Sequence, residues 1–271
     1  MISTAIARDV RRQSFAQPLP LDSTLSELCN ETPSHAFLVN PASQNTYLYL
    51  TEYIKSMSEQ WFKTRLGGLK ILDWGTGKGH MTYLLQKQHA SVTSCDIDDQ
   101  SNDSSFGQHT PVIAKCGIPV VPLRHEFLLP FANNSFDVVL SVGVLEHVPH
   151  EEKSLDELHR ILRPGGLFFC FYRPQRFSWT QQIARLRGDN YHDRLYTHAK
   201  VTRLLRNANF SPLDIWQRAL FPKNTVRYRN YRRAEIWDQR LCSRAPLRHF
   251  ATNLEFVAFN TLSIPKRVYS V

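Results

Sequence analysis

Residues 70–85 read KILDWGTGKGHMTYLL, an apolar run that ends at Asp73 and is followed by three glycines at alternate positions. The run predicts a strand, and the residues after the glycines predict a helix, so the glycines form the turn between them. Glycine lets the backbone approach a ligand without a Cβ in the way. Such a turn is able to hold a nicotinamide dinucleotide, a nucleoside triphosphate or a sulfonium nucleoside.

The spacing of the glycines distinguishes only in part between the three ligand classes. A phosphate-binding loop needs Gly-Lys followed by Ser or Thr, whereas Lys78 here precedes Gly79 and His80. The dinucleotide pattern needs its third glycine where His80 stands. Asp96, after the strand-like run SVTSC, is placed to accept hydrogen bonds from ribose hydroxyls. Both NAD and S-adenosylmethionine (SAM) carry that ribose, so Asp96 does not distinguish them.

Strand-like and helix-like segments alternate along the rest of the chain. Strands are predicted at 70–74, 91–95, 118–123, 136–142, 167–172, 212–219 and 254–262. Helices are predicted at 46–66, 80–88, 151–162 and 197–208, and a short helix before Gly117. Alternation with short connections predicts an α/β fold with a doubly wound, mostly parallel sheet. Ligands of such sheets bind at the carboxyl ends of the strands.

Two divisions of the chain are predicted. Residues 1–66 form a polar tail and a helical cap, in which Gly67-Gly68 ends the helix 46–66, and residues 67–271 form one domain. Within that domain, 173–198 is predicted to cover the substrate, and 221–250 is a basic insert. We expect a frayed tail at the N-terminus, because it lacks the apolar core of a signal peptide. No apolar run reaches the roughly 18 residues of a membrane span.

The net charge of +9 is concentrated in the basic insert. Residues 223–248 contain eight Lys or Arg against only Glu235 and Asp238. This segment suits an anionic substrate, a nucleic-acid surface or an acidic membrane face, and equally the solvated face of a lid helix. The five cysteines have no paired spacing, which argues against a disulfide framework or a metal site and favours a reducing, cytoplasmic compartment.

Four further blocks follow the glycine turn in a fixed order, and they are Leu129-Pro130-Phe131, Ser135-Phe136-Asp137, Leu145-Glu146-His147-Val148 and Leu162-Arg163-Pro164-Gly165-Gly166. Together with residues 73–79 they resemble the class I SAM-dependent methyltransferases, in the small-molecule branch that includes quinone-pathway enzymes. The resemblance covers residues 68–172 well and 173–262 more loosely. It implies a Rossmann-like sheet of seven strands, the last of them antiparallel, and SAM as the cofactor.

The resemblance also implies which residues hold SAM. The methionine end would lie along the turn, Asp96 would take the ribose hydroxyls, and Ile97 would pack on the adenine. The family often has Asp where His125 stands, so Glu126 or backbone groups are expected to supply that adenine contact. The residues assigned to the cofactor are Asp73, Gly75, Thr76, Gly77, Gly79, Asp96, Ile97, Glu126, Ser141 and Val142.

Methyl transfer from a sulfonium is an in-line displacement that needs positioning and, for a hydroxyl acceptor, removal of a proton. His147 is the first candidate base, because its loop faces the reacting methyl in this family. Tyr172 and His192 are further candidates from the segment after the fifth strand, which is rich in Tyr, His and Arg. The alternative is structural, since the Leu-Glu-His segment also shapes its loop and aromatic residues also pack inward.

The predicted function is methyl transfer to a small-molecule acceptor, with a hydroxyl slightly favoured and an anionic acceptor left open. Ser141-Val142-Gly143-Val144 stands where enzymes that methylate nucleobase amines or glutamine amides carry Asn-Pro-Pro-Tyr or Asp-Pro-Pro-Tyr, which disfavours that chemistry. Two alternatives are retained. One is a methyltransferase that acts on RNA or protein through the basic insert, and the other is a non-catalytic partner protein with the SAM fold.

Overall fold

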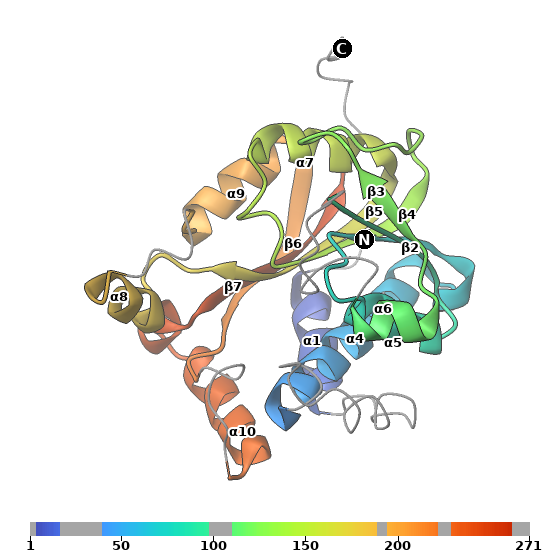
Figure 1. Ribbon diagram of the computed structural model, residues 1–271. Coiled ribbons are helices and arrows are strands. Elements are labelled where there is room, and N and C mark those ends of the chain that lie inside the picture. The colour runs from blue at the N-terminus through green and yellow to red at the C-terminus, as the bar shows by residue number, and fades with distance from the viewer. Residues whose placement is uncertain (1–3, 17–39, 98–109, 189–193, 222–228, 262–271) are drawn as a thin grey trace.

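A seven-stranded sheet forms the centre of the computed structural model, which describes residues 4–16, 40–97, 110–188, 194–221 and 229–261 (Figure 1). The strand order is β3-β2-β1-β4-β5-β7-β6. The strands are β1 (Lys70–Trp74), β2 (Ser91–Ile97), β3 (Val120–Leu123), β4 (Phe136–Val142), β5 (Leu162–Pro174), β6 (Phe210–Arg218) and β7 (Asn253–Asn260).

The directions of the strands confirm the predicted fold class. β1 pairs in parallel with β2 and β4, and β4 pairs in parallel with β5. β7 lies antiparallel between β5 and β6. Because β1, β2 and β4 run the same way, their last residues Trp74, Ile97 and Val142 lie at one edge of the sheet. That edge is where a doubly wound sheet binds its ligand.

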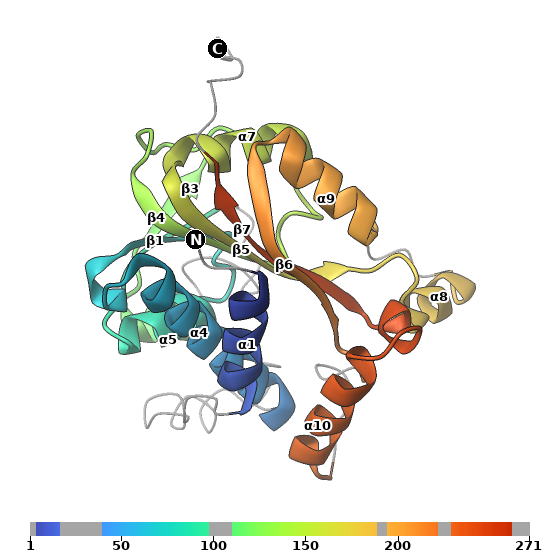
Figure 2. The same ribbon diagram turned by 180° about the vertical axis from the view of Figure 1, so that it is seen from behind.

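Helices cover both faces of the sheet (Figures 1 and 2). On one face lie α1, α4 and α5, and on the other lie α7 and α9. The helices are α1 (Thr4–Ala16), α4 (Pro41–Phe62), α5 (His80–Lys87), α6 (Pro111–Cys116), α7 (Glu151–Ile161), α8 (Trp179–Leu186), α9 (His198–Asn207) and α10 (Tyr231–Cys242), with short 3-10 turns at η1 (Leu66–Gly68) and η3 (Leu247–Phe250). No helix among the described residues is both long and apolar enough to cross a bilayer.

Each face of the sheet has its own core. On the α7 and α9 face, Leu158 and Leu205 pack with Phe168 of β5. On the other face, the ring of Tyr53 from α4 meets Phe169 at 5.7 Å and Trp216 at 5.6 Å between centroids. The strand residues alternate between the two cores, as the period of two requires.

Helix α4 begins and ends earlier than the predicted helix 46–66. The side chain of Asn40 accepts a hydrogen bond from Ala42 N at 3.0 Å and so caps the helix, which starts at Pro41. Lys63 adopts a left-handed conformation with φ 55° and ends it. The prediction that Gly67-Gly68 ends this helix is therefore wrong, because these glycines belong to the separate turn η1.

The expectation of a frayed N-terminal tail is wrong for residues 4–16, which form α1. This helix buries Ala7, Val10 and Ser14 against the molecule. Val10 belongs to the same core cluster as Tyr53 and Trp216, so α1 packs as part of the main fold. The rest of the predicted tail, residues 17–39, lies outside the described residues. The division at residue 66 stays a prediction.

Strand β5 is longer than predicted and includes the Arg-Pro-Gly-Gly block. The pairing of β4 with β5 shifts register between Phe136 and Val138, which accommodates the extra residues. Gly165 has φ +75°, and its carbonyl accepts a hydrogen bond from Trp61 Nε1 at 2.8 Å. The basic insert contains α10 and η3, although residues 222–228 of it lie outside the described part.

Candidate active site

The turn after β1 takes its shape from left-handed glycines and from β2. Gly75, Gly77 and Gly79 have φ of +73°, +52° and +79°. Cys95 O of β2 accepts hydrogen bonds from Gly75 N at 2.9 Å and Thr76 N at 3.0 Å. The backbone therefore turns at the carboxyl edge of the sheet, where glycine adopts these dihedral angles at least cost.

The three glycines meet different surroundings. A Cβ on Gly75 would lie 2.4 Å from Val144 Cγ2, and one on Gly79 would lie 2.6 Å from Ile113 Cγ1. A Cβ on Gly77 would meet no atom within 4 Å. Gly75 and Gly79 are therefore required by packing within the protein, whereas Gly77 borders open space.

Asp96 joins the turn to the end of β2. Its Oδ2 accepts from Gly77 N at 2.6 Å, and its Oδ1 accepts from Ile97 N at 2.8 Å. Burial raises the pKa of Asp96, against these two hydrogen bonds. An ionised carboxylate has about four acceptor positions, so its two oxygens retain capacity for further donors.

Asp73 lies beneath the turn. Its Oδ2 accepts from Thr76 Oγ1 at 2.9 Å and from Thr82 Oγ1 at 2.7 Å. The residue is 1% exposed, and burial raises its pKa to about 6. Asp73 and Thr76 therefore stabilise the turn from inside the protein and do not line the adjoining cavity.

A cavity of about 1110 Å³ opens at the carboxyl ends of β1, β2 and β4. Its lining includes many of the residues that the sequence predicted, namely Gly75, Gly77, Asp96, Ile97, Glu126, Val142 and His147. Ile97 is 67% exposed although it is a large apolar residue. An apolar side chain standing open in a cavity is a contact surface for a ligand.

His125 and Glu126 lie at the same cavity. His125 Nδ1 accepts from Phe127 N at 3.3 Å and from Leu128 N at 3.1 Å, so the neutral ring carries its proton on Nε2 and donates from there. Glu126 Oε2 lies 2.9 Å from His150 Nε2. Where the resemblance led us to expect a carboxylate for the adenine, the cavity thus presents a hydrogen-bond donor at His125, with Glu126 beside it.

The Leu-Glu-His segment contributes two neighbouring ionisable groups. His147 lines the cavity and is half exposed, and its Nε2 lies 3.9 Å from Glu146 Oε1. Glu146 is 4% exposed, its Oε2 has no hydrogen-bond partner, and burial raises its pKa to about 7. A carboxyl group with this pKa beside a cavity is typical of a functional site.

The remaining predicted residues lie elsewhere. Ser141 is fully buried within β4, and Gly79 packs against α6. Tyr172 stacks on Tyr47 with ring centroids 6.0 Å apart and does not line the cavity. His192 lies outside the described residues. Within the described residues, no three His, Cys, Asp or Glu are grouped so as to hold a metal ion.

A comparison with known protein families matches the segment that forms this cavity. A family model described as a methyltransferase domain matches residues 72–170, which include the glycine turn, Asp96 and the Leu-Glu-His segment. A methyltransferase domain thus spans residues 72–170. Relatives of the chain are named as S-adenosylmethionine-dependent methyltransferases, which supports SAM as the cofactor of this domain.

The chain spans about half the length of the first curated relative that it matches. It is 30% identical over 55% of both chains to a Mycolicibacterium smegmatis protein with the name "Probable S-adenosylmethionine-dependent methyltransferase". It is 27% identical to a Psychrobacter cryohalolentis ubiquinone biosynthesis O-methyltransferase, over 60% of this chain and 67% of the relative. A Galdieria sulphuraria structure described as a "putative sarcosine dimethylglycine methyltransferase" shares the fold, with a TM-score of 0.56 and 18% identity over 81% of this chain and 86% of that one.

The cavity fits SAM by its own geometry. Gly77 leaves room where a Cβ would intrude, Asp96 keeps acceptor positions for ribose hydroxyls, and Ile97 offers an apolar face to the adenine. Several further lining residues had no predicted role, namely Trp74, Leu123, Phe127, Leu129, Gly143 and Val144. Most of these residues lie at or just after the end of a strand, or belong to the Leu-Pro-Phe block. This position in the sequence is the signal that could have identified them.

Proposed function

We propose that the protein is a SAM-dependent methyltransferase, that it acts on a small-molecule acceptor, and that a hydroxyl oxygen is the nucleophile. The proposal rests chiefly on His147, which lies on the cofactor cavity with the buried Glu146 carboxyl 3.9 Å from its Nε2. A hydroxyl acceptor must lose a proton, and His is the most frequent residue for that step. The name of the Psychrobacter O-methyltransferase relative supports the same chemistry.

The protein's part in the reaction is to bind, orient and take up a proton. SAM, when bound, supplies an electrophilic methyl group. Asp96 accepts hydrogen bonds from the ribose, and Gly77 lets the backbone lie close to the cofactor. His147 accepts the acceptor's proton, and the Glu146 carboxylate stabilises the resulting imidazolium.

We also propose a reducing, cytoplasmic location. The thiols of Cys95 and Cys170 are free and buried in β2 and β5. Burial raises the pKa of both thiols, which keeps them protonated and unreactive. Such cysteines serve as small apolar core residues.

The cofactor site is tested by titrating the protein with SAM and with S-adenosylhomocysteine. Asp96→Ala is expected to weaken binding about tenfold or more, because hydrogen bonds to a charged group contribute about 1.5–3 kcal/mol. Asp137→Ala is the matched control, since Asp137 also accepts a backbone N–H, that of Lys70 at 2.6 Å, but lies at the opposite edge of the sheet. Absence of SAM binding by the wild type would overturn the site.

The base is tested by measuring S-adenosylhomocysteine release with panels of phenols, aliphatic alcohols and amines. His147→Gln is expected to lower kcat with hydroxyl acceptors by about 10²–10⁴, the usual contribution of a general base. SAM affinity should stay unchanged. His150→Gln is the control, because His150 pairs with Glu126 and does not line the cavity. Turnover of amines but not of hydroxyl compounds would refute the proposed acceptor.

A further inference from the structure

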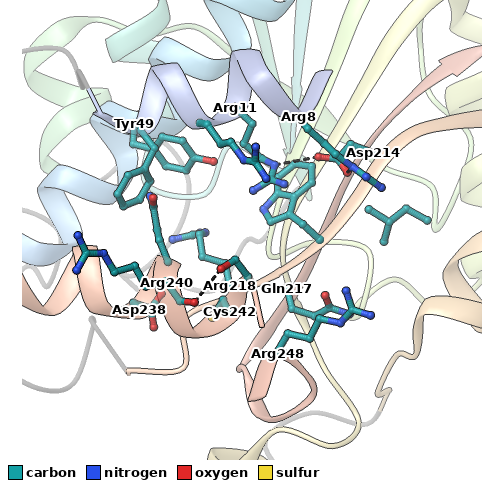
Figure 3. Close-up of a pocket in the computed structure, with 16 residues that line it drawn as sticks. Arg8, Arg11, Tyr49, Asp214, Gln217, Arg218, Asp238, Arg240, Cys242 and Arg248 are labelled. Carbon is teal, nitrogen blue, oxygen red and sulfur yellow. Dashed lines mark hydrogen bonds and ion pairs between the residues drawn. The ribbon is translucent and has the colours of Figure 1, made fainter. Parts of the chain in front are cut away.

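A second cavity, of about 480 Å³, lies between α1, the edge strand β6 and α10 (Figure 3). It shares no lining residue with the cofactor cavity. In the sheet, β5 and β7 separate β6 from β4, which borders the cofactor. A ligand bound here would therefore occupy a site of its own.

Arginine dominates the walls of this second cavity. Six arginines line it against two aspartates. They come from segments far apart in the sequence, with α1 on one side and α10 and η3 on another (Figure 3). The six are Arg8, Arg11, Arg12, Arg218, Arg240 and Arg248.

Both aspartates are already engaged within the protein. Asp214 has a side chain only 1% exposed and pairs with Arg8 at 3.2 Å and Arg11 at 2.9 Å. Asp238 accepts hydrogen bonds from Ala219 N at 3.1 Å and Phe221 N at 2.8 Å, which attaches α10 to the end of β6. Two carboxylates offset only part of the positive charge of six arginines.

The positive charge that is left over faces the cavity. Arg218 is held by Glu255, at 2.8 Å and 2.6 Å, and Arg12 lies 3.9 Å from the exposed Asp9. Among the described residues, no carboxylate forms an ion pair with Arg240 or Arg248. Like charges gathered around a concave surface attract an anion there.

The chemistry of the lining indicates the kind of anion. Guanidinium groups present paired donors that match phosphate oxygens. Phe15, Tyr49 and Trp216 add aromatic surface, and the Arg11 guanidinium lies 4.6 Å from the centre of the Trp216 ring. The cavity is large enough for an organic ligand as well as a simple ion. We propose that this arginine pocket binds the phosphate group of a phosphorylated small ligand.

The test is a calorimetric titration with inorganic pyrophosphate, at fixed ionic strength and with S-adenosylhomocysteine saturating the cofactor site. The variant Arg12→Gln/Arg248→Gln removes one charge from each of two walls, and it is expected to weaken binding about tenfold or more. Arg232→Gln/Arg233→Gln is the matched control, because both residues are exposed on α10 and neither lines the pocket. Its affinity should equal that of the wild type. Because the readout is binding and not turnover, a failed methyl-transfer assay leaves this test intact.

Further probes separate the sources of the phosphate and the rival explanations. Phenyl phosphate represents a free metabolite, and phosphatidic acid vesicles, against phosphatidylcholine vesicles, represent a lipid headgroup. If phenyl phosphate or phosphatidic acid vesicles bind to the wild type, and the pocket variant alone loses this binding, the result supports the proposal. The probe that binds identifies the source of the phosphate group. Three results would overturn it, namely no saturable binding, equal weakening in both variants, or displacement of S-adenosylhomocysteine by pyrophosphate. An oligonucleotide that binds wild type and loses affinity equally in both variants would indicate a nucleic-acid surface instead.

Discussion

Single residues of the glycine turn divide into those needed for packing and those facing the ligand. Gly75 and Gly79 have no room for a Cβ beside Val144 and Ile113, whereas Gly77 has open space. The sequence predicted all three as cofactor residues, because spacing alone does not show what each glycine touches. Asp73 illustrates the same limit, since it was expected beside the methionine and is bound to Thr82 beneath the turn.

Gly77→Ala tests this division. The left-handed φ of +52° costs an alanine roughly 1 kcal/mol, and the added methyl enters the cofactor cavity, so SAM affinity should fall about tenfold. Gly165→Ala is the matched control, because its φ is +75° with no atom within 4 Å of the new Cβ and it lies in β5 away from the cavity. Both variants should lose similar unfolding free energy. Unchanged SAM affinity in Gly77→Ala would contradict the geometry.

Glu146 makes stability depend on pH. Its folded pKa of about 7 lies above the ordinary 4.5, so the folded state binds more protons than the unfolded state between these values. Stability therefore falls as pH rises from about 4.5 to 7, where the buried carboxyl ionises. Asp73, with a pKa of about 6, acts in the same direction up to that pH.

The substitution Glu146→Gln should remove the contribution of this side chain to the pH dependence of stability. At pH 8 the variant is expected to be more stable than the wild type by up to about 3 kcal/mol, since each unit of pKa shift corresponds to about 1.36 kcal/mol. At pH 4.5 the difference should vanish, because Glu146 is then protonated. Urea unfolding at both pH values measures this. Glu152→Gln, on the exposed start of α7, is the control, and an equal difference at both pH values would rule out the buried charge as the cause.

At the scale of elements, prediction succeeded where a pattern is local. Most strand limits lay within two residues of the predicted ones, because each strand is an apolar run bounded by polar or turn residues. Helix α1 was missed because its buried face is small, and Arg11 anchors it to Asp214, 203 residues away. Helix α10 likewise buries Glu235 and Asp238, two acids that a sequence pattern assigns to the surface. Contacts between residues so far apart in the sequence leave no periodic pattern in it.

Val10→Ala measures how firmly α1 is attached. Val10 is 6% exposed in the core cluster of α4 and the sheet, so its truncation should cost about 1–3 kcal/mol of unfolding free energy. Asp9→Ala is the control on the exposed face of the same helix. A cost below about 0.5 kcal/mol for Val10→Ala would mean that α1 does not share the core.

At the scale of the molecule, the sheet separates two sites with different chemistry. The residues that line the cofactor cavity come from one continuous segment, residues 74–149, and for that reason its family resemblance was readable in the sequence. The arginine pocket combines residues from positions 8 to 248. The sequence showed the excess positive charge of the basic insert but not its meeting with α1 and β6, because only the folded chain brings them together.

The position of β7 between β5 and β6 affects how the chain folds during its synthesis. Among the strands that the structure describes, β6 pairs with β7 alone, and β5 has β7 as its second neighbour. While residues 253–260 are still inside the ribosome, the emerging chain exposes an unpaired edge along β5, where Phe169 and Phe171 stand. Unpaired apolar edges associate with other chains. Strand β7 thus inserts between two strands that are synthesised before it, and until it emerges the edge of β5 is open to association with other chains.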